Sequence, residues 1–292
     1  HTIKIKYLDA KKAEPIKVSG LPVNAKLANF SWSPDEQMIA MTNTTDDNVE
    51  LWVLDIHAAT VHKLSKLKLN ANPGNVINWL KGSDAVLVKV IPKDRKPLID
   101  TDKSIPTGPT ISTSDGKKAQ NRTYQDLLKN KNDEFNFEQL TLSEIHKVNL
   151  NGTSTLWMKT SMYRGVNFSP NGEYVLVTKI EKPFSYLVPY YRFPSVSTIV
   201  TKYAKEVHVV SRVPLIEDLP KGFMSVRTGK RSLQWRSDVG ATIVYAEALD
   251  EGDAANEVKF RDEIFQLEAP FNGRPKSILK TINRFSYIEW GA

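Results

Sequence analysis

The side chains that could do chemistry in this sequence are few and scattered. No Gly-x-Ser-x-Gly elbow occurs, so the signature of a nucleophilic serine on an α/β-hydrolase turn is absent. The chain contains no cysteine, which removes thiolate catalysis, disulfides and cysteine-bound metals together. It also has no glycine-rich loop of the kind that cradles phosphates. Taken alone, these residues predict a binding scaffold with no catalytic residue, no metal and no cofactor.

The histidines do not have the spacing of a metal site. None of the five has a partner at the helical spacing of metal ligands, and we expect most of them to be exposed strand residues. They are His1, His57, His62, His146 and His208.

Four acidic residues gather in one short segment near the C-terminal end. They are Glu247, Asp250, Glu251 and Asp253. Carboxylates in such a cluster could chelate Ca²⁺, but the spacing of an EF-hand loop is absent. A solvated acidic turn is therefore the favoured interpretation.

The composition of the 292 residues is that of an ordinary globular chain, with 40% hydrophobic and 25% charged residues. A net charge of +7 would suit nucleic acid or another anionic surface. However, Lys and Arg are scattered and never form a run of five, so nucleic-acid binding is disfavoured. No apolar run approaches the length of a membrane span, and no secretory signal opens the chain.

The elements that would position any site follow a repeated pattern. Residues 166–180 read as a strand ending in an aromatic residue, a Ser-Pro-Asn-Gly turn, and a second strand with alternating bulky residues. Similar copies occupy residues 30–41, 76–90 and 232–245, and a fifth start appears at 287–291. The repeated aromatic positions are Trp32, Trp79, Phe168, Trp235 and Trp290.

A repeat with this signature predicts a β-propeller, and unrelated hairpins in a sandwich are the alternative. Residues 2–19 predict an initial hairpin with a turn at 9–12. Four four-stranded blades follow, starting near residues 28, 75, 163 and 231, and one last strand lies at 287–291. These strands either close as five blades or form an arc of a larger propeller, and the end just after Gly291 favours a fragment.

Residues 91–140 read as an insertion between the second and third strands of the second blade. The stretch is too long for a hairpin loop and accounts for the 89 residues between two of the repeated aromatics. Within it, residues 123–130 have helical spacing, and Thr123 could cap that helix. The chain thus reads as one domain, 1–292, with a helical insertion at 91–140.

Residues 183–194 in the third blade are rich in aromatics and contain three prolines and one arginine. The prolines rule out a central strand across the whole stretch. Either this segment packs on the core as an edge strand and loop, or it forms a recognition surface, and packing is favoured.

Several phrases in the sequence resemble one known family. They are Ile105–Thr110, Arg122–Leu128, Tyr190–Pro194, Glu247–Glu257 and Arg261–Phe265. Together they resemble the N-terminal propeller of the prolyl-oligopeptidase family of serine peptidases, and most of all its glutamyl endopeptidase branch. The resemblance extends from about residue 21 to residue 290.

The resemblance implies a parent peptidase in which the propeller limits access of peptides to a separate α/β-hydrolase domain. That domain would contain the catalytic triad, and it is absent from this chain, so no triad residue can be assigned. The resemblance also implies an exported, periplasmic parent protein. A free-standing propeller that binds a protein or peptide is the alternative, and in either case we expect this chain by itself to be inert.

A peptidase that prefers acidic side chains needs a cation near its cleft, and arginine can bind a carboxylate with two parallel hydrogen bonds. Arg192, between Tyr190, Tyr191 and Phe193, is the first candidate for contact with a peptide substrate, and Arg122 is the second. Tyr190 and Tyr191 are further candidates for this contact. An ordinary salt bridge is the favoured alternative for both arginines.

Overall fold

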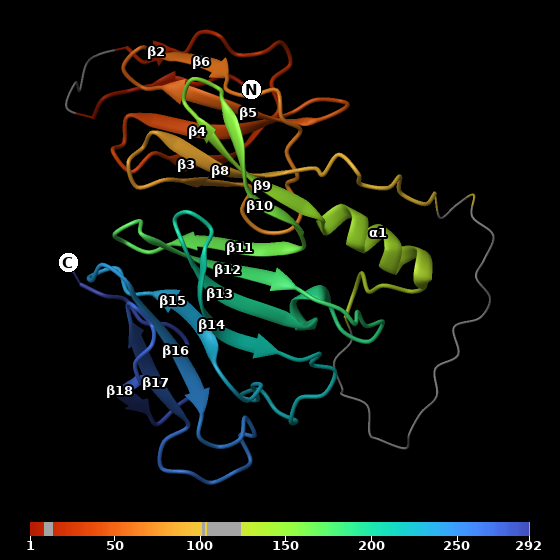
Figure 1. The fold of residues 1–292 in the computed structure, drawn as a ribbon, viewed down its shortest axis with the longest axis vertical. Coiled ribbons are helices and arrows are strands. Elements are labelled where there is room, and N and C mark those ends of the chain that lie inside the picture. The colour runs from red at the N-terminus through yellow and green to blue at the C-terminus, as the bar shows by residue number, and fades with distance from the viewer. Residues whose placement is uncertain (9–13, 101–102, 104–123, 292) are drawn as a thin grey trace. The chain divides into compact units, whose positions relative to one another are not determined.

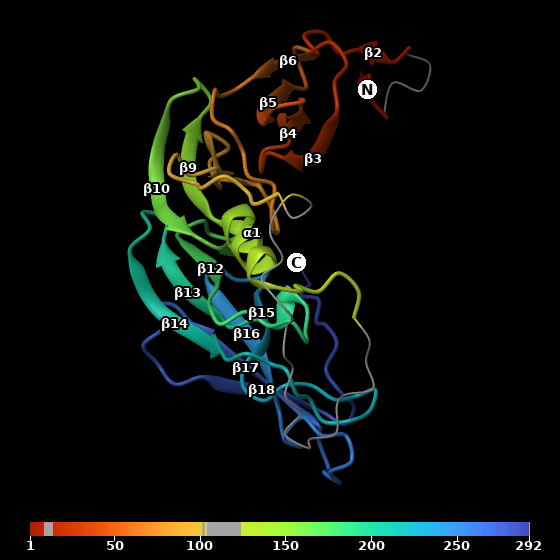
Figure 2. The ribbon, with the colours of Figure 1, turned by 90° about the vertical axis from the view of Figure 1, so that its right-hand side faces the viewer.

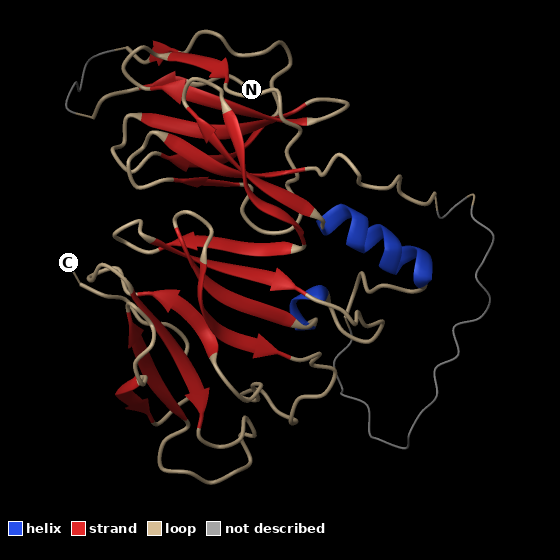
Figure 3. Cartoon of the chain, in the orientation of Figure 1, coloured by secondary structure: helices blue, strands red, loops and turns tan. Residues whose placement is uncertain are grey.

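The computed structural model describes residues 1–8, 14–100, 103 and 124–291. This part of the chain folds almost entirely as antiparallel β-structure, with one α-helix and one 3₁₀ turn (Figures 1 and 3). It divides into two compact units, residues 1–96 with 140–166 and residues 97–139 with 167–292. Neither helical element is long and apolar enough to cross a membrane, as judged on the described residues.

The first unit contains three sheets. A small sheet pairs β1 (Lys4–Ile5) with β2 (Ile16–Lys17). One four-stranded sheet then runs through β3 (Leu27–Trp32), β4 (Met38–Thr44), β5 (Val49–Asp55) and β6 (Thr60–Lys63). The next runs through β7 (Ile77–Trp79), β8 (Ala85–Val90), β9 (Ser143–Asn149) and β10 (Ser154–Ser161). In both four-stranded sheets every strand pairs with its successor in the chain, so each sheet is a meander.

Two more four-stranded meanders follow in the sequence. One consists of β11 (Tyr163–Phe168), β12 (Tyr174–Ile180), β13 (Ser195–Thr201) and β14 (Glu206–Val213). The other consists of β15 (Arg231–Trp235), β16 (Thr242–Ala248), β17 (Asp262–Glu268) and β18 (Lys276–Thr281). Within the second unit, β12–β14 and β15–β18 lie side by side in both views (Figures 1 and 2). The strands predicted for the four repeats, and the all-β class, are confirmed.

The repeated turn has the same hydrogen bonds in its two strongest copies. The Ser33 hydroxyl donates to Asp35 Oδ1 at 2.6 Å and accepts the Met38 amide at 2.9 Å. The Ser169 hydroxyl likewise donates to Asn171 Oδ1 at 2.8 Å and accepts an amide from β12. Gly172 supplies the positive φ of this turn, at 74°, as predicted. A serine followed two residues later by Asp or Asn therefore fixes the turn between the first and second strands in these two repeats.

The repeated tryptophans join neighbouring sheets through the same contact. In the first unit, the Trp79 indole N–H donates to the Ser31 carbonyl of the preceding sheet at 2.9 Å. In the second unit, the Trp235 indole donates to the Asn167 carbonyl at 2.9 Å. In both cases the acceptor is the residue just before the aromatic of the preceding repeat. The aromatic positions therefore fix the register between consecutive sheets.

Apolar side chains from neighbouring sheets form the core of each unit. In the first unit, β3–β6 and β7–β10 share a cluster that includes Leu51, Val53, Val86 and Val88. In the second unit, Leu176, Ile199 and Ile243 belong to a comparable cluster. Burying one such side chain stabilises the fold by about 1.5–3 kcal/mol, so stacking of the sheets is the main source of stability.

Two predictions about single elements are wrong. No helix forms over residues 124–130, and Thr123 lies outside the described residues; α1 instead spans Lys131–Thr141, between β8 and β9. The Asn130 side chain accepts the Asp133 amide at 2.9 Å, which satisfies an orphan donor of the first helical turn. The expected strand at 287–291 is also absent, although these residues are described. There the Gln234 side chain, rather than a backbone ladder, contacts the Ile288 carbonyl, at 3.3 Å.

A buried ionic cluster ties the loops of the second unit together. Arg284 donates to Asp250 at 2.6 Å and to Asp262 at 2.7 Å, and both carboxylates are fully buried. Arg261 also donates to Asp250, at 2.9 Å, and Arg231 forms an ion pair with Asp262. Burial raises the pKa of Asp250, but the hydrogen bonds from Arg284 and Arg261 outweigh it, so the pKa is lowered. The predicted solvated acidic turn is therefore wrong for Asp250.

Replacement of Arg284 should destabilise the chain strongly. Arg284→Met leaves two buried carboxylates without their shared cation, and we expect a loss of about 3–5 kcal/mol in the free energy of unfolding. Lys276→Met removes one member of an exposed ion pair with Glu268 and should cost less than about 1 kcal/mol. Urea unfolding followed by tryptophan fluorescence measures both. Equal losses in the free energy of unfolding would show that the buried cluster stabilises the chain no more than an exposed ion pair does.

A lysine is buried among apolar residues in the first unit. Lys89 lies on β8, where all six residues are buried, and its ammonium donates to the Pro73 carbonyl. Burial lowers the pKa of Lys89 to about 8. The unfolded chain holds this proton up to its ordinary pKa near 10.5, so the free energy of unfolding should rise between about pH 8 and 10.5.

We therefore expect Lys89→Met to stabilise the chain at neutral pH. Methionine keeps the length of the side chain and removes the charge, and the expected gain is roughly 1–3 kcal/mol. Urea unfolding at pH 7 and pH 10 tests this, because the advantage of the variant must shrink at the higher pH. Lys81→Met, at an exposed position, is the matched control. A gain in stability that does not depend on pH would show that the buried charge of Lys89 is not its cause.

Candidate functional site

The segment between β12 and β13 contains three of the residues selected from the sequence. Its prolines keep it out of the sheet, as predicted, and Tyr190–Arg192 form a 3₁₀ turn. The Arg192 amide donates to the Pro189 carbonyl at 2.9 Å, and the Phe193 amide donates to the Tyr190 carbonyl at 3.1 Å. Pro189 and Phe193 flank the turn in extended conformation. The turn therefore sits between two fixed ends.

Aromatic contacts hold this segment against α1. The Phe137 ring of the helix lies 5.0 Å from Phe184, 5.5 Å from Phe193 and 6.2 Å from Tyr190, measured between ring centroids. Phe184 also stacks on Phe193 at 5.2 Å. Each such pair contributes roughly 0.5–1.5 kcal/mol beyond area burial. Helix and turn thus form one rigid aromatic cluster, consisting of Phe137, Phe184, Tyr190 and Phe193.

Arg192 is almost completely covered. Its residue is 7% exposed, and its guanidinium lies 5.2 Å from the centroid of the Tyr124 ring. Its carbonyl accepts the Ile216 amide at 3.0 Å, which fixes the backbone as well. This geometry fits an arginine packed within the fold, which is the favoured alternative, better than an arginine that is open to a substrate. The role of Arg192 in substrate contact stays a prediction.

The two tyrosines beside Arg192 are accessible. Tyr190 is 40% exposed and Tyr191 is 50% exposed, with their ring centroids 6.2 Å apart. Arg122, the remaining candidate, lies outside the described residues. The structure therefore brings three of the four candidates together and presents the tyrosines, rather than the arginine, to solvent.

A hollow of about 320 Å³ lies where α1 meets the same segment. It is lined by Lys131, Glu134, Phe135, Glu138, Lys182, Pro183 and Phe184. Its charges are already paired. Lys131 Nζ lies 2.8 Å from Glu134, and the hydrogen bond raises the pKa of Lys131. Lys182 Nζ likewise lies 2.8 Å from Glu138. Such a surface can bind polar chains but offers no activated nucleophile.

Metal-binding side chains do not gather in the described part of the chain. Among the described residues, no three His, Asp or Glu side chains gather closely enough to hold a metal ion. His146 Nε2 lies 2.8 Å from Glu144 on the same strand face of β9. Its side chain is only 16% exposed, so His146 is not among the exposed histidines. The spacing of two residues along one strand was the signal that could have revealed the pair.

Two curated relatives are similar to almost the whole chain. One is a "Probable glutamyl endopeptidase, chloroplastic" of Oryza sativa subsp. japonica, 31% identical over 303 aligned residues. The alignment covers 98% of this chain and 31% of the relative. The protein of the same name from Arabidopsis thaliana is 31% identical over 290 residues, covering 94% of the chain and 29% of the relative. The chain thus spans about a third of the length of these relatives.

Solved structures show weaker likenesses. Pyrococcus horikoshii acylaminoacyl peptidase has a TM-score of 0.46 and 13% identity, over 95% of this chain and 34% of that one. The β-propeller domain of the Trilobed protease from Pyrococcus furiosus has a TM-score of 0.45 and 9% identity, over 88% and 58%. Likenesses as weak as these do not establish a shared fold. No protein-family model matches the chain.

The alignments with the two sequence relatives nevertheless extend over nearly the whole chain. Over nearly its whole length, this chain is related to proteins named glutamyl endopeptidase, which confirms the resemblance to this branch of the prolyl-oligopeptidase family of serine peptidases.

Proposed function

We propose that this chain is the β-propeller region of a serine peptidase of the glutamyl endopeptidase kind, and that it limits which peptides reach a separate α/β-hydrolase domain. The observation that carries the proposal is the alignment of 98% of the chain with only 31% of a probable glutamyl endopeptidase. A chain of this kind would supply a scaffold for the peptidase, while the reacting groups would lie elsewhere in the parent protein.

The sheet architecture supports the propeller part of this proposal. Four meanders of four antiparallel strands follow one another in the described chain, which is how propeller blades are connected. Strands such as β8 and β13 are buried along almost their whole length, so both of their faces need a covering layer. Indole-to-carbonyl contacts also recur between consecutive sheets. Stacked blades meet all three conditions. The residues between β8 and β9, with α1, would then be the predicted insertion into the second blade.

The segment at 183–194 supports the substrate-contact part. Tyr190 and Tyr191 are exposed on a turn that the aromatic cluster holds rigid, and tyrosine provides a large contact area at little entropic cost. A rigid aromatic surface of this kind suits the side chains and backbone of an extended peptide. Export of the parent protein stays a prediction from the resemblance.

Labelling the native source protein with a fluorophosphonate probe tests the peptidase proposal. The probe reacts covalently with an activated serine, and denaturing gel electrophoresis then gives the size of the labelled polypeptide. A labelled band well above the 33.0 kDa of this chain is the expected result. An unlabelled protein of about 33 kDa would instead favour the free-standing propeller that binds a partner.

Substitution of Arg192 in the full-length parent protein tests the assignment of a substrate contact. If Arg192 contacts the substrate, Arg192→Ala should lower kcat/KM for cleavage after glutamate about tenfold or more, because a charge-assisted hydrogen bond to a carboxylate is lost. Cleavage after glutamine should change much less. The ratio of kcat/KM for the two substrates distinguishes a lost contact with the glutamate side chain from a general loss of folded protein.

Arg212→Ala is the matched control, because Arg212 is exposed on β14 of the same unit. An equal loss on both substrates would assign Arg192 to packing alone and would leave the labelling result untouched.

A further inference from the structure

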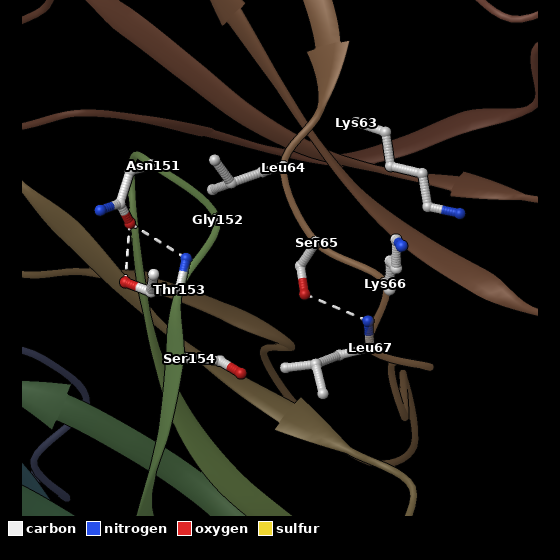
Figure 4. A pocket seen from close by; sticks show the side chains of 9 residues that line it. All are labelled: Lys63, Leu64, Ser65, Lys66, Leu67, Asn151, Gly152, Thr153 and Ser154. Atoms are coloured by element: carbon white, nitrogen blue, oxygen red, sulfur yellow. Dashed lines mark hydrogen bonds between the residues drawn. The ribbon is translucent and has the colours of Figure 1, made fainter.

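The first unit contains a second hollow, which is larger than the one beside α1. It measures about 570 Å³ and lies between the segment after β6 and the turn that joins β9 to β10 (Figure 4). Its lining consists of Lys63, Leu64, Ser65, Lys66, Leu67, Asn151, Gly152, Thr153 and Ser154. No residue of the proposed substrate surface belongs to it.

The two walls of this hollow are held at a fixed separation. Gly152 has a φ of +83°, and a Cβ at this position would lie 2.8 Å from the Leu64 carbonyl oxygen. Only glycine can therefore bring the β9–β10 turn this close to the segment after β6. Within the turn, Asn151 Oδ1 accepts both the amide and the hydroxyl of Thr153, at 3.0 and 2.7 Å. The hollow is thus built into the fold.

Two hydroxyl groups face the space between the walls. Figure 4 shows the Ser65 and Ser154 oxygens turned toward it, whereas the Thr153 hydroxyl is turned toward Asn151. Ser65 is only 7% exposed, and its oxygen accepts the Leu67 amide at 3.1 Å. The proton of Ser65 therefore remains to be donated, and no acceptor for it occurs among the described residues. A donor buried to this degree needs an acceptor from water or a ligand.

The charge of the lining is entirely positive. Lys63 is engaged by Glu50 at 2.6 Å, and Figure 4 shows its ammonium pointing away from the β9–β10 turn. Lys66 pairs with no carboxylate in the described part of the chain. No acidic residue lines the hollow. Figure 4 shows the Lys66 ammonium on the side of Ser65 away from Ser154, so this exposed lysine would have to turn toward the hydroxyls. Once turned, an ammonium and two hydroxyl donors would be complementary to a small oxyanion.

We propose that this hollow binds an oxyanion, with Lys66 supplying the charge and Ser65 and Ser154 donating hydrogen bonds to its oxygens. A carboxylate on an acidic peptide and free inorganic phosphate share this chemistry. The site belongs to the first unit and does not depend on the peptidase proposal.

Titration calorimetry of the 292-residue chain at low ionic strength tests the proposal. The probes are inorganic phosphate and a blocked Gly-Glu-Gly peptide, with blocked Gly-Gln-Gly as the uncharged match. We expect saturable binding of phosphate, of the glutamyl peptide or of both, and none of the glutaminyl peptide. Which probe binds distinguishes a phosphate site from a carboxylate site, and saturation by neither would overturn the proposal.

Two lysine variants of equal charge localise the binding. Lys66→Gln should weaken it roughly tenfold, since a charge-assisted contact is lost. Lys68→Gln, at an exposed lysine outside the lining, should change it less than about twofold. Ser154→Ala should weaken binding while the unfolding midpoint stays unchanged. Equal losses in the two lysine variants would mean that diffuse surface charge attracts the anion, and would refute the site.

Discussion

The structure depends above all on strands that must be covered on both faces. β8 is buried at every residue, and β13 and β16 are buried over most of their length. Side chains of a strand alternate between its two faces, so a single apolar layer cannot satisfy such a strand. Each meander therefore needs a neighbour, and the two apolar clusters show this stacking within each unit. The tryptophan-to-carbonyl contacts then fix how far one sheet can slide along the next.

Polar groups that this stacking buries have been satisfied in different ways. Arg284 donates hydrogen bonds to Asp250, to Asp262 and to the Met224 carbonyl, so one guanidinium joins three separate segments of the second unit. Lys89 shows the opposite case: in the described part of the chain its ammonium donates to the Pro73 carbonyl and pairs with no carboxylate, and burial lowers its pKa. A paired buried charge specifies an arrangement of loops, whereas an unpaired one is a net cost. The chain tolerates the buried ammonium of Lys89 because apolar contacts hold β8 in place.

Local patterns in the sequence were sufficient for the strands and insufficient for the buried polar contacts. The serine turns and alternating residues act over a few positions, so all four meanders could be predicted. α1 was misplaced because Asn130 caps it, whereas the spacing of residues 123–130 predicted an earlier helix with Thr123 as its cap. Asp250 looked like part of a solvated cluster because its partner Arg284 follows 34 residues later. The Arg192 guanidinium lies over the Tyr124 ring, a contact that sequence spacing does not reveal. Residues that approach only through the fold cannot be paired from sequence spacing.

The difference between regular strands and irregular segments also separates the scaffold from the surfaces that could bind other molecules. Strands such as β8, β13 and β16 have most of their side chains buried in packing, so little of them remains for recognition. The accessible tyrosines lie on a proline-rich segment that leaves the sheet. The Ser65 and Ser154 hydroxyls lie at the hollow between the segment after β6 and the β9–β10 turn. In both places a rigid neighbour fixes the irregular segment, either the Phe137 ring or the close approach of Gly152 to Leu64. A binding group held in this way loses little entropy when its ligand arrives. The fold thus holds in place, through α1 and through the close approach of two loops, the irregular segments proposed to bind ligands.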